Sequence, residues 1–187
     1  RDLSEIMSEA EVAFGDASVY IERYLTDIRH IEMQVISDGE TTLHLGERDC
    51  TAQRRNQKLI EEAPSPALDA GLRQSLAEAS VALCRAVGYR NAGTVEFVFD
   101  NVERKFYFIE MNTRIQVEHP VTEMVTGIDL IKLQLQIASG IKLDISQRDI
   151  RVDGHAIECR INAENPQRGF APSPGTVVSF RAPGGFG

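Results

Sequence analysis

The chain has 187 residues, which is enough for one domain with a hydrophobic core or for part of a larger one. Its hydrophobic share of 42% and charged share of 26% exclude a disordered or collagen-like chain. With 20 basic against 28 acidic residues, the net charge of -8 argues against a nucleic-acid groove as the main surface.

Cysteine usage and apolar runs bear on the compartment. The three cysteines are odd in number and are not spaced as a metal-ligand set, which favours a reduced intracellular compartment. No apolar run approaches the roughly 18 residues of a membrane span, and no signal-peptide pattern opens the chain. We therefore expect a cytoplasmic protein without membrane or nucleic-acid partners, or a mitochondrial-matrix protein if the source is eukaryotic. The abrupt start and the Gly-Gly-Phe-Gly end predict an excerpt from a longer protein.

The first third of the sequence predicts a helix and then an antiparallel meander. Apolar residues recur at helical spacing over residues 3–14, and Gly15 fits the position that ends a helix. Alternating or β-branched runs predict strands at 19–25, 30–36 and 41–45. Residues 47–66 are polar and end in Pro-Ser-Pro, which predicts an ordered loop.

The remainder predicts two core helices and further strands. Asp69 can cap a helix that Gly88 closes. A second helix is predicted over 122–139, with an apolar face made of Met124, Ile128, Ile131, Leu135 and Ala138. Strands are predicted at 94–99, 106–111, 154–162 and, after a loop, in the tail at 165–180. The whole pattern predicts an α+β fold, an antiparallel sheet with flanking helices.

A row of polar side chains stands out in the stretch FYFIEMNTRIQVEHPVTEM at 106–124. Its members occupy alternate positions: Glu110, Asn112, Arg114, Gln116 and Glu118. In an extended backbone, alternate side chains point to one face. Because apolar residues flank the row, its setting looks buried, and the row needs partners.

Glu96 interrupts a strand whose other residues favour burial. If the strands at 94–99 and 106–111 form a hairpin, Glu96 falls within about one residue of Glu110, with opposed Cβ atoms roughly 5 Å apart. Two such carboxylates repel each other unless one is protonated or a cation lies between them. Asn112 adds a third oxygen, and an all-oxygen set suits Mg²⁺ or Mn²⁺. The alternative is that each glutamate pairs separately with a surface cation; the spacing favours the metal.

The rest of the row has the chemistry of an anion site. Arg114 offers a planar fork for an oxyanion, and Gln116 adds donors. Glu118 is a candidate general base, and Pro120 is expected to keep His119 extended, which would fix how Glu118 is presented. His119 itself reads as a structural residue.

Two further features leave alternatives open. The donor-rich run QRRNQK at 53–58 is either a solvated loop or the flank of an anion site. Arg160 lies between apolar residues of a predicted strand, where it could form a salt bridge with Glu158. Cys159 is expected to be inert core.

Several stretches together resemble the biotin carboxylase family. They are ERDCTAQRRNQK with EEAP, AGTVEF, EMNTRIQVEHPVTEMVTG, GHAIECRINAE followed by PSPG, and APGGFG, in order from Tyr20 onward. The resemblance implies a partial ATP-grasp domain over 1–153, without the family's N-terminal domain and Gly-rich lid, and the start of the biotin carboxylase C-terminal domain over 154–187. It implies an enzyme that converts ATP, bicarbonate and biotin to carboxybiotin, ADP and phosphate.

The resemblance also implies roles for single residues. The metal, Mg²⁺ or Mn²⁺, would be held by Glu96, Glu110 and Asn112. Bicarbonate would be bound by Arg114, Gln116 and the backbone of Val117, with Lys58 at the anion centre. Glu118 would deprotonate bicarbonate, and Arg160 would stabilise the biotin enolate.

The nucleotide contacts come from the same resemblance. Adenine would meet Glu22, Arg23 and Leu25, and the ribose side would meet His30 and Gln53. Asn56 departs from the pattern, since many members carry His there, and this weakens the nucleotide contact expected at position 56.

The implied partners are a biotin carboxyl carrier protein or domain, a carboxyltransferase subunit or domain, and a second copy of the chain. The stretch EEAPSP leans slightly toward an acyl-CoA carboxylase. Because the lid is missing, we expect the isolated chain to be inactive. Two alternatives remain: another ATP-grasp ligase, of the amide-forming or carbamoyl-phosphate type, and a non-catalytic interaction module.

Overall fold

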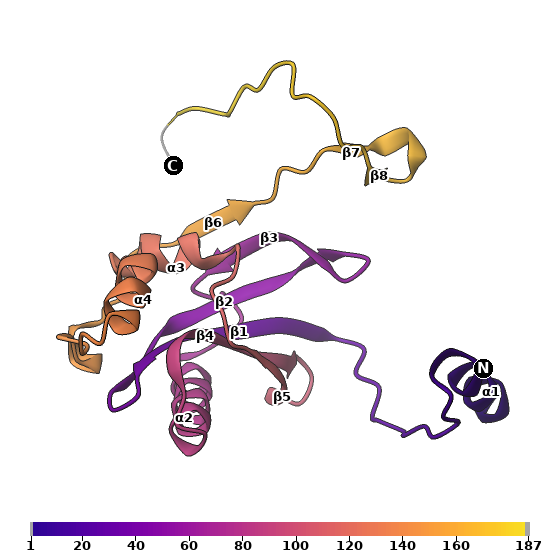
Figure 1. The fold of residues 1–187 in the computed structure, drawn as a ribbon, viewed down its shortest axis with the longest axis horizontal. Helices are drawn as coiled ribbons and strands as arrows, with labels where there is room; N and C mark the ends of the chain where they lie inside the picture. Colours follow the sequence, from indigo (N-terminus) through magenta and orange to yellow (C-terminus); the bar gives the residue numbers. More distant parts are fainter. Residues whose placement is uncertain (1, 186–187) are drawn as a thin grey trace.

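A six-stranded antiparallel sheet forms the centre of the computed structural model, which describes residues 2–185 (Figure 1). The strands lie in the order β5-β4-β1-β2-β3-β6. Their bounds are β1 Ile28–Asp38, β2 Thr42–Arg54, β3 Gln57–Ala63, β4 Arg90–Asp100, β5 Lys105–Asn112 and β6 Ala156–Cys159. Two short strands, β7 Glu164–Asn165 and β8 Ala171–Pro172, pair separately.

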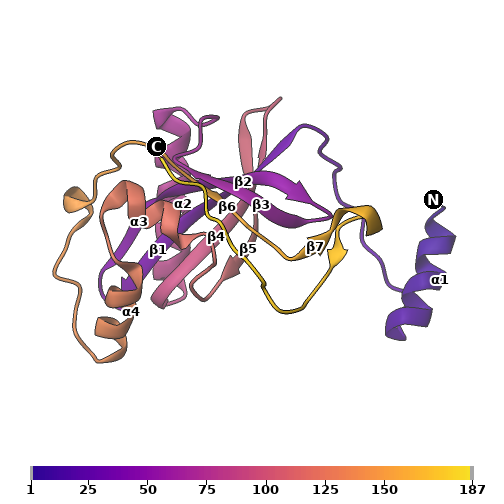
Figure 2. The ribbon, with the colours of Figure 1, turned by 90° about the horizontal axis from the view of Figure 1, so that it is seen from above.

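The described part of the chain has four α-helices. They are α1 Leu3–Phe14, α2 Ala70–Ala86, α3 His119–Thr126 and α4 Leu130–Ala138, with two 3-10 turns at Gln147–Asp149 and Pro166–Arg168. Of these helices, α2 covers one face of the sheet, and α3 and α4 cover the other (Figure 1). In both Figure 1 and Figure 2, α1 stands apart from the sheet at the end of an extended segment, and none of its residues is buried. Within residues 2–185, the structure has no helix that is both long enough and apolar enough to cross a membrane.

Strand alternation divides the core into two clusters on opposite faces of β1. Odd-numbered residues of β1, such as Ile31 and Met33, pack with Phe97 and Phe99 of β4 beneath Leu76 of α2. On the other face lies a second cluster, made of Ile36, Leu43, Leu45, Ala92, Leu130, Leu133 and Ile137. The even-numbered Glu32 and Gln34 share this second face and are fully buried. On β1, the buried polar side chains Glu32 and Gln34 therefore lie on the face opposite to the cluster beneath α2.

A bulge in β2 decides which of its polar residues reach that polar face. The β1–β2 register advances two residues on β1, from Met33 to Val35, against three on β2, from Glu47 back to His44. Gly46, with φ of 85°, lies in this interval, where only glycine adopts the left-handed backbone without strain. The extra residue inverts the alternation, so that Arg48 rather than Glu47 points toward Glu32.

The predicted elements are partly confirmed. The helices at 3–14 and from Asp69 onward form, as do the strands at 30–36, 94–99 and 106–111. The loop predicted at 47–66 is wrong, because these residues complete β2 and form β3. The hairpin turns at Arg55 and Asn56, whose φ angles of 51° and 63° suit a two-residue hairpin connection. Its polar side chains line a cavity, which explains why the run lacks apolar alternation.

Other predictions are wrong. No strand forms at 19–25 or, within the described tail, at 173–180. The helix predicted at 122–139 is two helices, because Gly127 ends α3 in the left-handed region and Asp129 caps α4. The face predicted to be core is largely exposed, with Met124 at 77% and Leu135 at 66%. Cys159 is also exposed rather than core.

The polar row does not lie on one buried strand. β5 is an edge strand with mostly exposed side chains, and it ends at Asn112. Residues 113–118 form an irregular connection, and His119 is helical despite the following Pro120, which is tolerated at the start of a helix. The imidazole Nδ1 of His119 lies 2.7 Å from the carbonyl oxygen of Gln116 and stabilises this tight entry. The bent connection turns Gln116 and Glu118 inward, where both are buried.

The Asp69 cap provides a test of how α2 is anchored. Asp69 Oδ1 accepts the Leu72 amide at 2.9 Å, and its Oδ2 pairs with Arg104 at 2.8 Å. Asp69→Ala is expected to lower the free energy of unfolding by about 1 kcal/mol in urea, because a helix N-cap is lost. Arg104→Ala leaves the cap and removes the exposed ion pair together with the cation–π contact of its guanidinium, 5.6 Å from the Phe99 ring centroid, so it should cost less than the loss of the cap. Equal losses in the two variants would contradict the cap as the source of stability.

Candidate functional site

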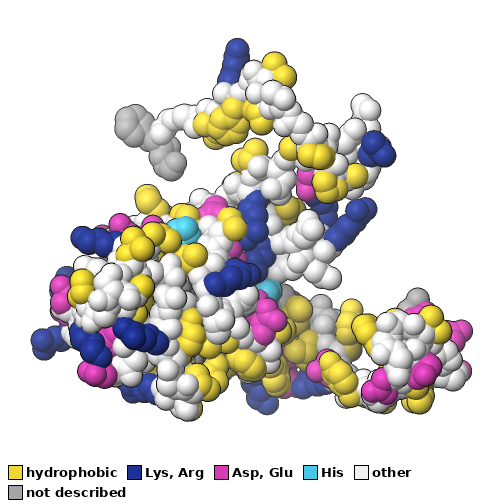
Figure 3. Space-filling view, in the orientation of Figure 1, with side chains coloured by type: hydrophobic (Ala, Val, Ile, Leu, Met, Phe, Trp, Pro, Cys, Tyr) yellow, Lys and Arg dark blue, Asp and Glu magenta, His cyan; other side chains and the backbone are white. Residues whose placement is uncertain are grey.

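A polar cavity of about 730 Å³ is lined by residues of the five neighbouring strands β1 to β5, of the 113–118 connection and of the segment after β6. Figure 3 shows basic and acidic side chains gathered beside this hollow. Most of the residues predicted to be functional line it: His30, Gln53, Asn56, Lys58, Glu96, Glu110, Asn112, Arg114, Gln116, Val117, Glu118 and Arg160. The structure thus places these residues around one cavity, and their functional roles stay predictions.

The carboxylate pair expected from the hairpin is present. Glu96 of β4 and Glu110 of β5 are direct cross-strand partners. The amide nitrogen of Asn112 lies 3.0 Å from Glu96 Oε1 and 3.1 Å from Glu110 Oε1, so that it bridges the two acids. With its amide turned so that Oδ1 instead of the nitrogen faces the two acids, Asn112 would complete a set of three oxygen ligands, which suits a hard cation such as Mg²⁺ or Mn²⁺. The residues present therefore fit the metal that the sequence predicts.

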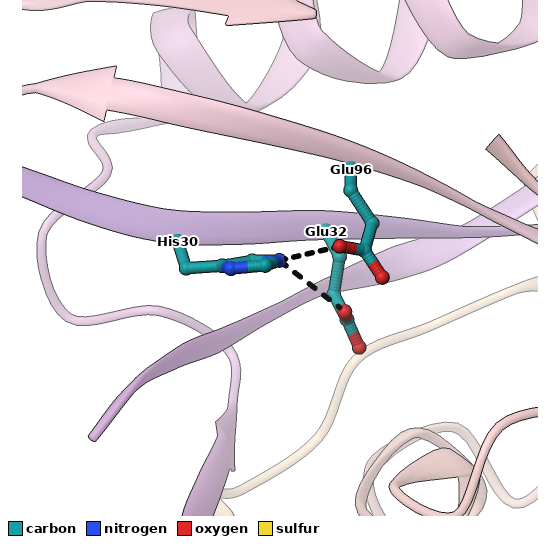
Figure 4. A group of neighbouring side chains, drawn as sticks. All are labelled: His30, Glu32 and Glu96. Atoms are coloured by element: carbon teal, nitrogen blue, oxygen red, sulfur yellow. Dashed lines mark hydrogen bonds and ion pairs between the residues drawn. The ribbon is translucent and has the colours of Figure 1, made fainter. Parts of the chain in front are cut away.

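Donors surround Glu96. His30 Nε2 lies 2.7 Å from Glu96 Oε2, and Gln116 Nε2 donates to Glu96 Oε1 at 2.8 Å. Figure 4 shows the His30 ring, from β1, reaching the carboxylates of both Glu32, from β1, and Glu96, from β4. Burial alone would raise the pKa of Glu96, but the hydrogen bond from His30 and the charge of Lys58 outweigh it and lower the pKa to about 2. Glu96 is thus an ionised acid that a cation can use.

Lys58 is the cation at the centre of the cavity. Its ammonium lies 2.5 Å from Glu32 Oε2, 2.7 Å from Glu118 Oε1 and 3.1 Å from Glu96 Oε1. Burial works to lower the pKa of Lys58, but these carboxylates raise it above its usual range. The ammonium therefore stays charged, and it is the group nearest to an anion entering the site.

Glu118 is held between two cations. One oxygen accepts from Lys58, and the other accepts from Arg160 Nη2 at 2.9 Å. Arg160 is itself fixed, because its Nε donates to Glu61 Oε1 at 2.6 Å and its backbone amide donates to Leu59. Burial favours a raised pKa for Glu118, yet the hydrogen bond and charge of Lys58 lower it. Glu118 is therefore an ionised carboxylate in a water-poor place, as a general base must be.

The open side of the cavity carries Arg114 and Val117. Arg114 Nη2 donates to Asn112 Oδ1 at 3.2 Å, and the side chain is otherwise exposed. Val117 is 62% exposed, so its backbone is accessible at the rim. Asn56 lies at the tip of the β2–β3 hairpin, where its left-handed φ favours Asn. Arg114, Val117 and Asn56 can therefore contact a ligand without a rearrangement of the core.

Three predicted residues lie outside the cavity. Glu22, Arg23 and Leu25 belong to the extended segment between α1 and β1. Arg23 donates to Glu103 Oε1 at 2.6 Å instead. The expected contact of these three residues with adenine stays a prediction.

Sequence analysis missed three buried charges that organise the site. They are Glu32 and Arg48, which are fully buried, and Glu61, which holds Arg160. Glu32 could have been found, because it interrupts a strand that otherwise favours burial, as Glu96 does. Arg48 could not, because the bulge at Gly46 reverses the alternation on which such reasoning depends.

The comparisons with known proteins agree with one another. Residues 2–146 match the family described as carbamoyl-phosphate synthase L chain, ATP binding domain. The chain is 59% identical over 180 residues to biotin carboxylase 1 of Bacillus subtilis, covering 96% of this chain and 40% of that protein. It is 58% identical over 181 residues to the biotin carboxylase of Pseudomonas aeruginosa, covering 96% of this chain and 40% of that protein. The chain therefore spans about 40% of the length of these curated relatives.

Solved structures are equally similar. The biotin carboxylase domain of a thermophilic 2-oxoglutarate carboxylase bound to bicarbonate matches with a TM-score of 0.93 and 52% identity, covering 99% of this chain and 42% of that one. The biotin carboxylase domain dimer of Hydrogenobacter thermophilus 2-oxoglutarate carboxylase, in complex with MgADP, ADP and bicarbonate, matches with a TM-score of 0.86 and 51% identity, covering 99% of this chain and 41% of that one.

The depressed pKa of Glu96 predicts a pH dependence of stability. Folding lowers the pKa of Glu96 from 4.5 to about 2. Its ionised form therefore stabilises the fold fully at a pH above 4.5, the pKa in the unfolded chain. This contribution is lost as the pH falls toward the pKa of about 2 in the folded protein. Between these two pH values, the free energy of unfolding measured in urea should fall by up to about 3 kcal/mol more in the wild type than in Glu96→Gln.

Glu103 is a matched control that separates the effect of burial on stability from the effect of a hydrogen bond to the carboxylate. The hydrogen bond from Arg23 also lowers the pKa of Glu103 to about 2, but Glu103 is exposed. Because solvent screens this pair, Glu103→Gln should follow the wild-type pH curve. If the free energy of unfolding fell with pH in the same way in the wild type and in Glu96→Gln, the acid loss of stability could not be assigned to Glu96.

Proposed function

The chain belongs to the family of the carbamoyl-phosphate synthase L chain ATP-binding domain, and within it to the biotin carboxylases, and we propose that it forms the ATP- and bicarbonate-binding part of a biotin-dependent carboxylase. The whole protein would use ATP and bicarbonate to carboxylate biotin on a carrier. The observation that carries this proposal is the ionised Glu118, buried between Lys58 and Arg160 at the wall of an anion-sized polar cavity. A non-catalytic module would have no need of three buried acids around one ammonium.

Glu118 acts as the general base. Bicarbonate binds with its oxygens toward Arg114, the Gln116 amide and the Val117 backbone, beside the Lys58 ammonium. Glu118 takes the proton of the bicarbonate hydroxyl, and the freed electron pair lets that oxygen attack the γ-phosphorus of ATP. The new oxygen–phosphorus bond replaces the bond to the bridging oxygen, so that ADP leaves and carboxyphosphate remains. The cations around Glu118 keep it ionised until bicarbonate arrives.

Carboxyphosphate then breaks into CO₂ and phosphate beside biotin. The released phosphate takes the ureido N–H proton of biotin, and the resulting enolate attacks CO₂ through nitrogen. Arg160 supplies a fixed positive charge for the enolate oxygen, because Glu61 and the Leu59 carbonyl hold it in place. The guanidinium reaches this position from β6, on the opposite side of Glu118 from Lys58.

The metal site would use Glu96, Glu110 and Asn112. When bound, Mg²⁺ or Mn²⁺ neutralises charge on the ATP phosphates. Glu96 is already ionised, and Asn112 holds the two acids in register. The complex of MgADP with the similar Hydrogenobacter domain supports this part of the proposal.

The nucleotide would extend from the metal site along β1 and β2. His30 and Gln53 contact each other at 3.0 Å and face the cavity from these strands, which suits a ribose hydroxyl pair. Asn56 at the hairpin tip offers an amide where many relatives of this kind would offer an imidazole. Glu22, Arg23 and Leu25 would close over adenine from the segment before β1.

The parent protein would supply the remaining parts. We propose a biotin carrier and a carboxyltransferase as its partners, because similar solved structures include a complete multifunctional pyruvate carboxylase from Rhizobium etli. Pairing with a second copy is proposed because the similar Hydrogenobacter domain is a dimer. The domain boundary at residue 153 and the cytoplasmic location remain proposals. β6, beyond that boundary, pairs with β3 and so continues the same sheet.

The full-length protein provides the direct test. ADP formation from MgATP should require bicarbonate and should rise when biotin is added, while the isolated 187-residue chain should give no such rate. Ammonia in place of biotin should not stimulate it. An ADP-forming rate that follows ammonia and ignores biotin would favour a carbamoyl-phosphate-type ligase and overturn the proposal.

Glu118→Gln separates the base from binding. In the full-length protein, kcat for bicarbonate-dependent ATP cleavage should fall by about 10²–10⁴-fold, the usual contribution of a positioned base. The affinity for MgADP, measured by calorimetry, should stay within about twofold because Glu118 belongs to the bicarbonate side. Glu62→Gln is the control, since Glu62 pairs with His155 away from the cavity. A kcat loss equal to that of Glu62→Gln would rule out Glu118 as the base.

A further inference from the structure

Arg48 is the largest fully buried side chain of the described residues, and it does not line the cavity. Its guanidinium nevertheless donates to five side chains on four separate segments. Two of these acceptors, Glu32 and Gln116, continue directly into the site. A buried charge with this many partners raises the question of what it orients.

The first connection runs through Glu32 to Lys58. Arg48 Nε donates to Glu32 Oε1 at 2.6 Å, which fixes the carboxylate plane. The second oxygen, Oε2, then receives the Lys58 ammonium at 2.5 Å. Since Glu32 is fully buried and cannot turn to solvent, the place of the Lys58 ammonium follows from the place of Arg48.

The second connection fixes which end of the Gln116 amide faces the cavity. Arg48 Nη2 donates to Gln116 Oε1 at 3.1 Å. A guanidinium has donors and no acceptor, so only the amide oxygen can face it. The amide nitrogen must then point the other way, and it donates to Glu96 Oε1 at 2.8 Å. Arg48 thereby turns Gln116 into a donor at the cavity wall.

The remaining contacts anchor the guanidinium in the scaffold. Nη1 donates to Gln34 Oε1 at 2.7 Å and to Thr122 Oγ1 at 2.9 Å, while Nη2 also donates to Thr94 Oγ1 at 3.2 Å. These acceptors belong to β1, α3 and β4, so three separate elements of the fold set the guanidinium plane. A lysine ammonium, with three donors on one nitrogen, cannot reproduce this spread.

We propose that Arg48 is a positioning residue that acts on bicarbonate through Gln116 and through the Glu32–Lys58 pair. The inference rests on the proposed function. Arg48 touches no substrate; it sets the donor direction of one side chain and the location of one ammonium. Its loss should therefore weaken the use of bicarbonate far more than the binding of nucleotide.

The test uses the full-length protein with Arg48→Lys. We expect the KM for bicarbonate to rise at least about tenfold, since charge-assisted hydrogen bonds lose their geometry, while the Kd for MgADP changes less than about threefold. In a Gln116→Ala background, the same substitution should raise the KM by a clearly smaller factor than in the wild-type background, because only the route through Glu32 and Lys58 is left to lose. If Arg48 had only a structural role, the two substitutions would act independently, and their fold-changes in the bicarbonate KM would multiply.

Thr122→Val is the matched control. It removes one anchor of the guanidinium on the α3 side but leaves the contacts with Glu32 and Gln116. Its melting temperature should fall while its bicarbonate KM stays within about twofold of the wild type. A bicarbonate KM raised as much as in Arg48→Lys would show that general loosening, not orientation, is responsible, and would overturn the inference.

Gln116→Glu keeps the inference testable if Arg48→Lys does not fold. The glutamate retains the oxygen that accepts from Arg48 but replaces the inward NH₂ by a second oxygen. We expect a folded protein whose bicarbonate KM is raised at least about tenfold, and an unchanged KM would overturn the inference. A wild-type protein without bicarbonate-dependent ATP cleavage would overturn the proposed function and this inference with it. If the wild type is active and the bicarbonate KM of Arg48→Lys is unchanged, the inference about Arg48 is overturned while the proposed function stands.

Discussion

One ammonium, that of Lys58, lies among three carboxylates, and the charges around it alternate outward in both directions. Arg48, Glu32 and Lys58 follow one another on one side, and Glu118, Arg160 and Glu61 continue on the other. Most of these groups are buried, where an unpaired charge would cost several kcal/mol. Each is tolerated because its neighbour has the opposite sign. Removing any inner member would leave two like charges facing each other in a place that water does not reach.

The sheet brings these alternating charges together. The members come from β1, β2, β3, the residue that follows β6 and the residue that precedes α3, so the series exists only when strands distant in sequence lie side by side. The apolar core beneath α2 holds the opposite face of β1 and β4, and this leaves their polar face free to carry charge. The same arrangement keeps the proposed base Glu118 ionised and the neighbouring cations charged, and it places Glu96 beside Glu110, where we propose that a metal binds. Chemistry and stability thus depend on the same contacts.

Local sequence was sufficient where the contacts were local. Glu96 and Glu110 are joined by a short hairpin turn, so counting residues from the turn predicted their pairing, and the structure bears it out. Helix caps such as Asp69 were visible for the same reason. The alternation rule failed in β2, where the bulge at Gly46 exchanges the two faces and hides Arg48. It failed again after Asn112, where the row leaves its strand and turns inward. The contacts of Glu32 and Glu61 join strands far apart in sequence, which no single stretch encodes.

The pKa of Glu118 tests the central claim most directly. In a ¹³C-NMR titration of the glutamate carboxyl groups, the wild-type Glu118 should titrate below its usual range, because Lys58 lowers its pKa against the effect of burial. In Lys58→Met, burial and the nearby acids remain while the ammonium is gone, so the pKa of Glu118 should rise by at least about one unit. An unchanged pKa in that variant would contradict the account, because the base would then not depend on the alternating charges.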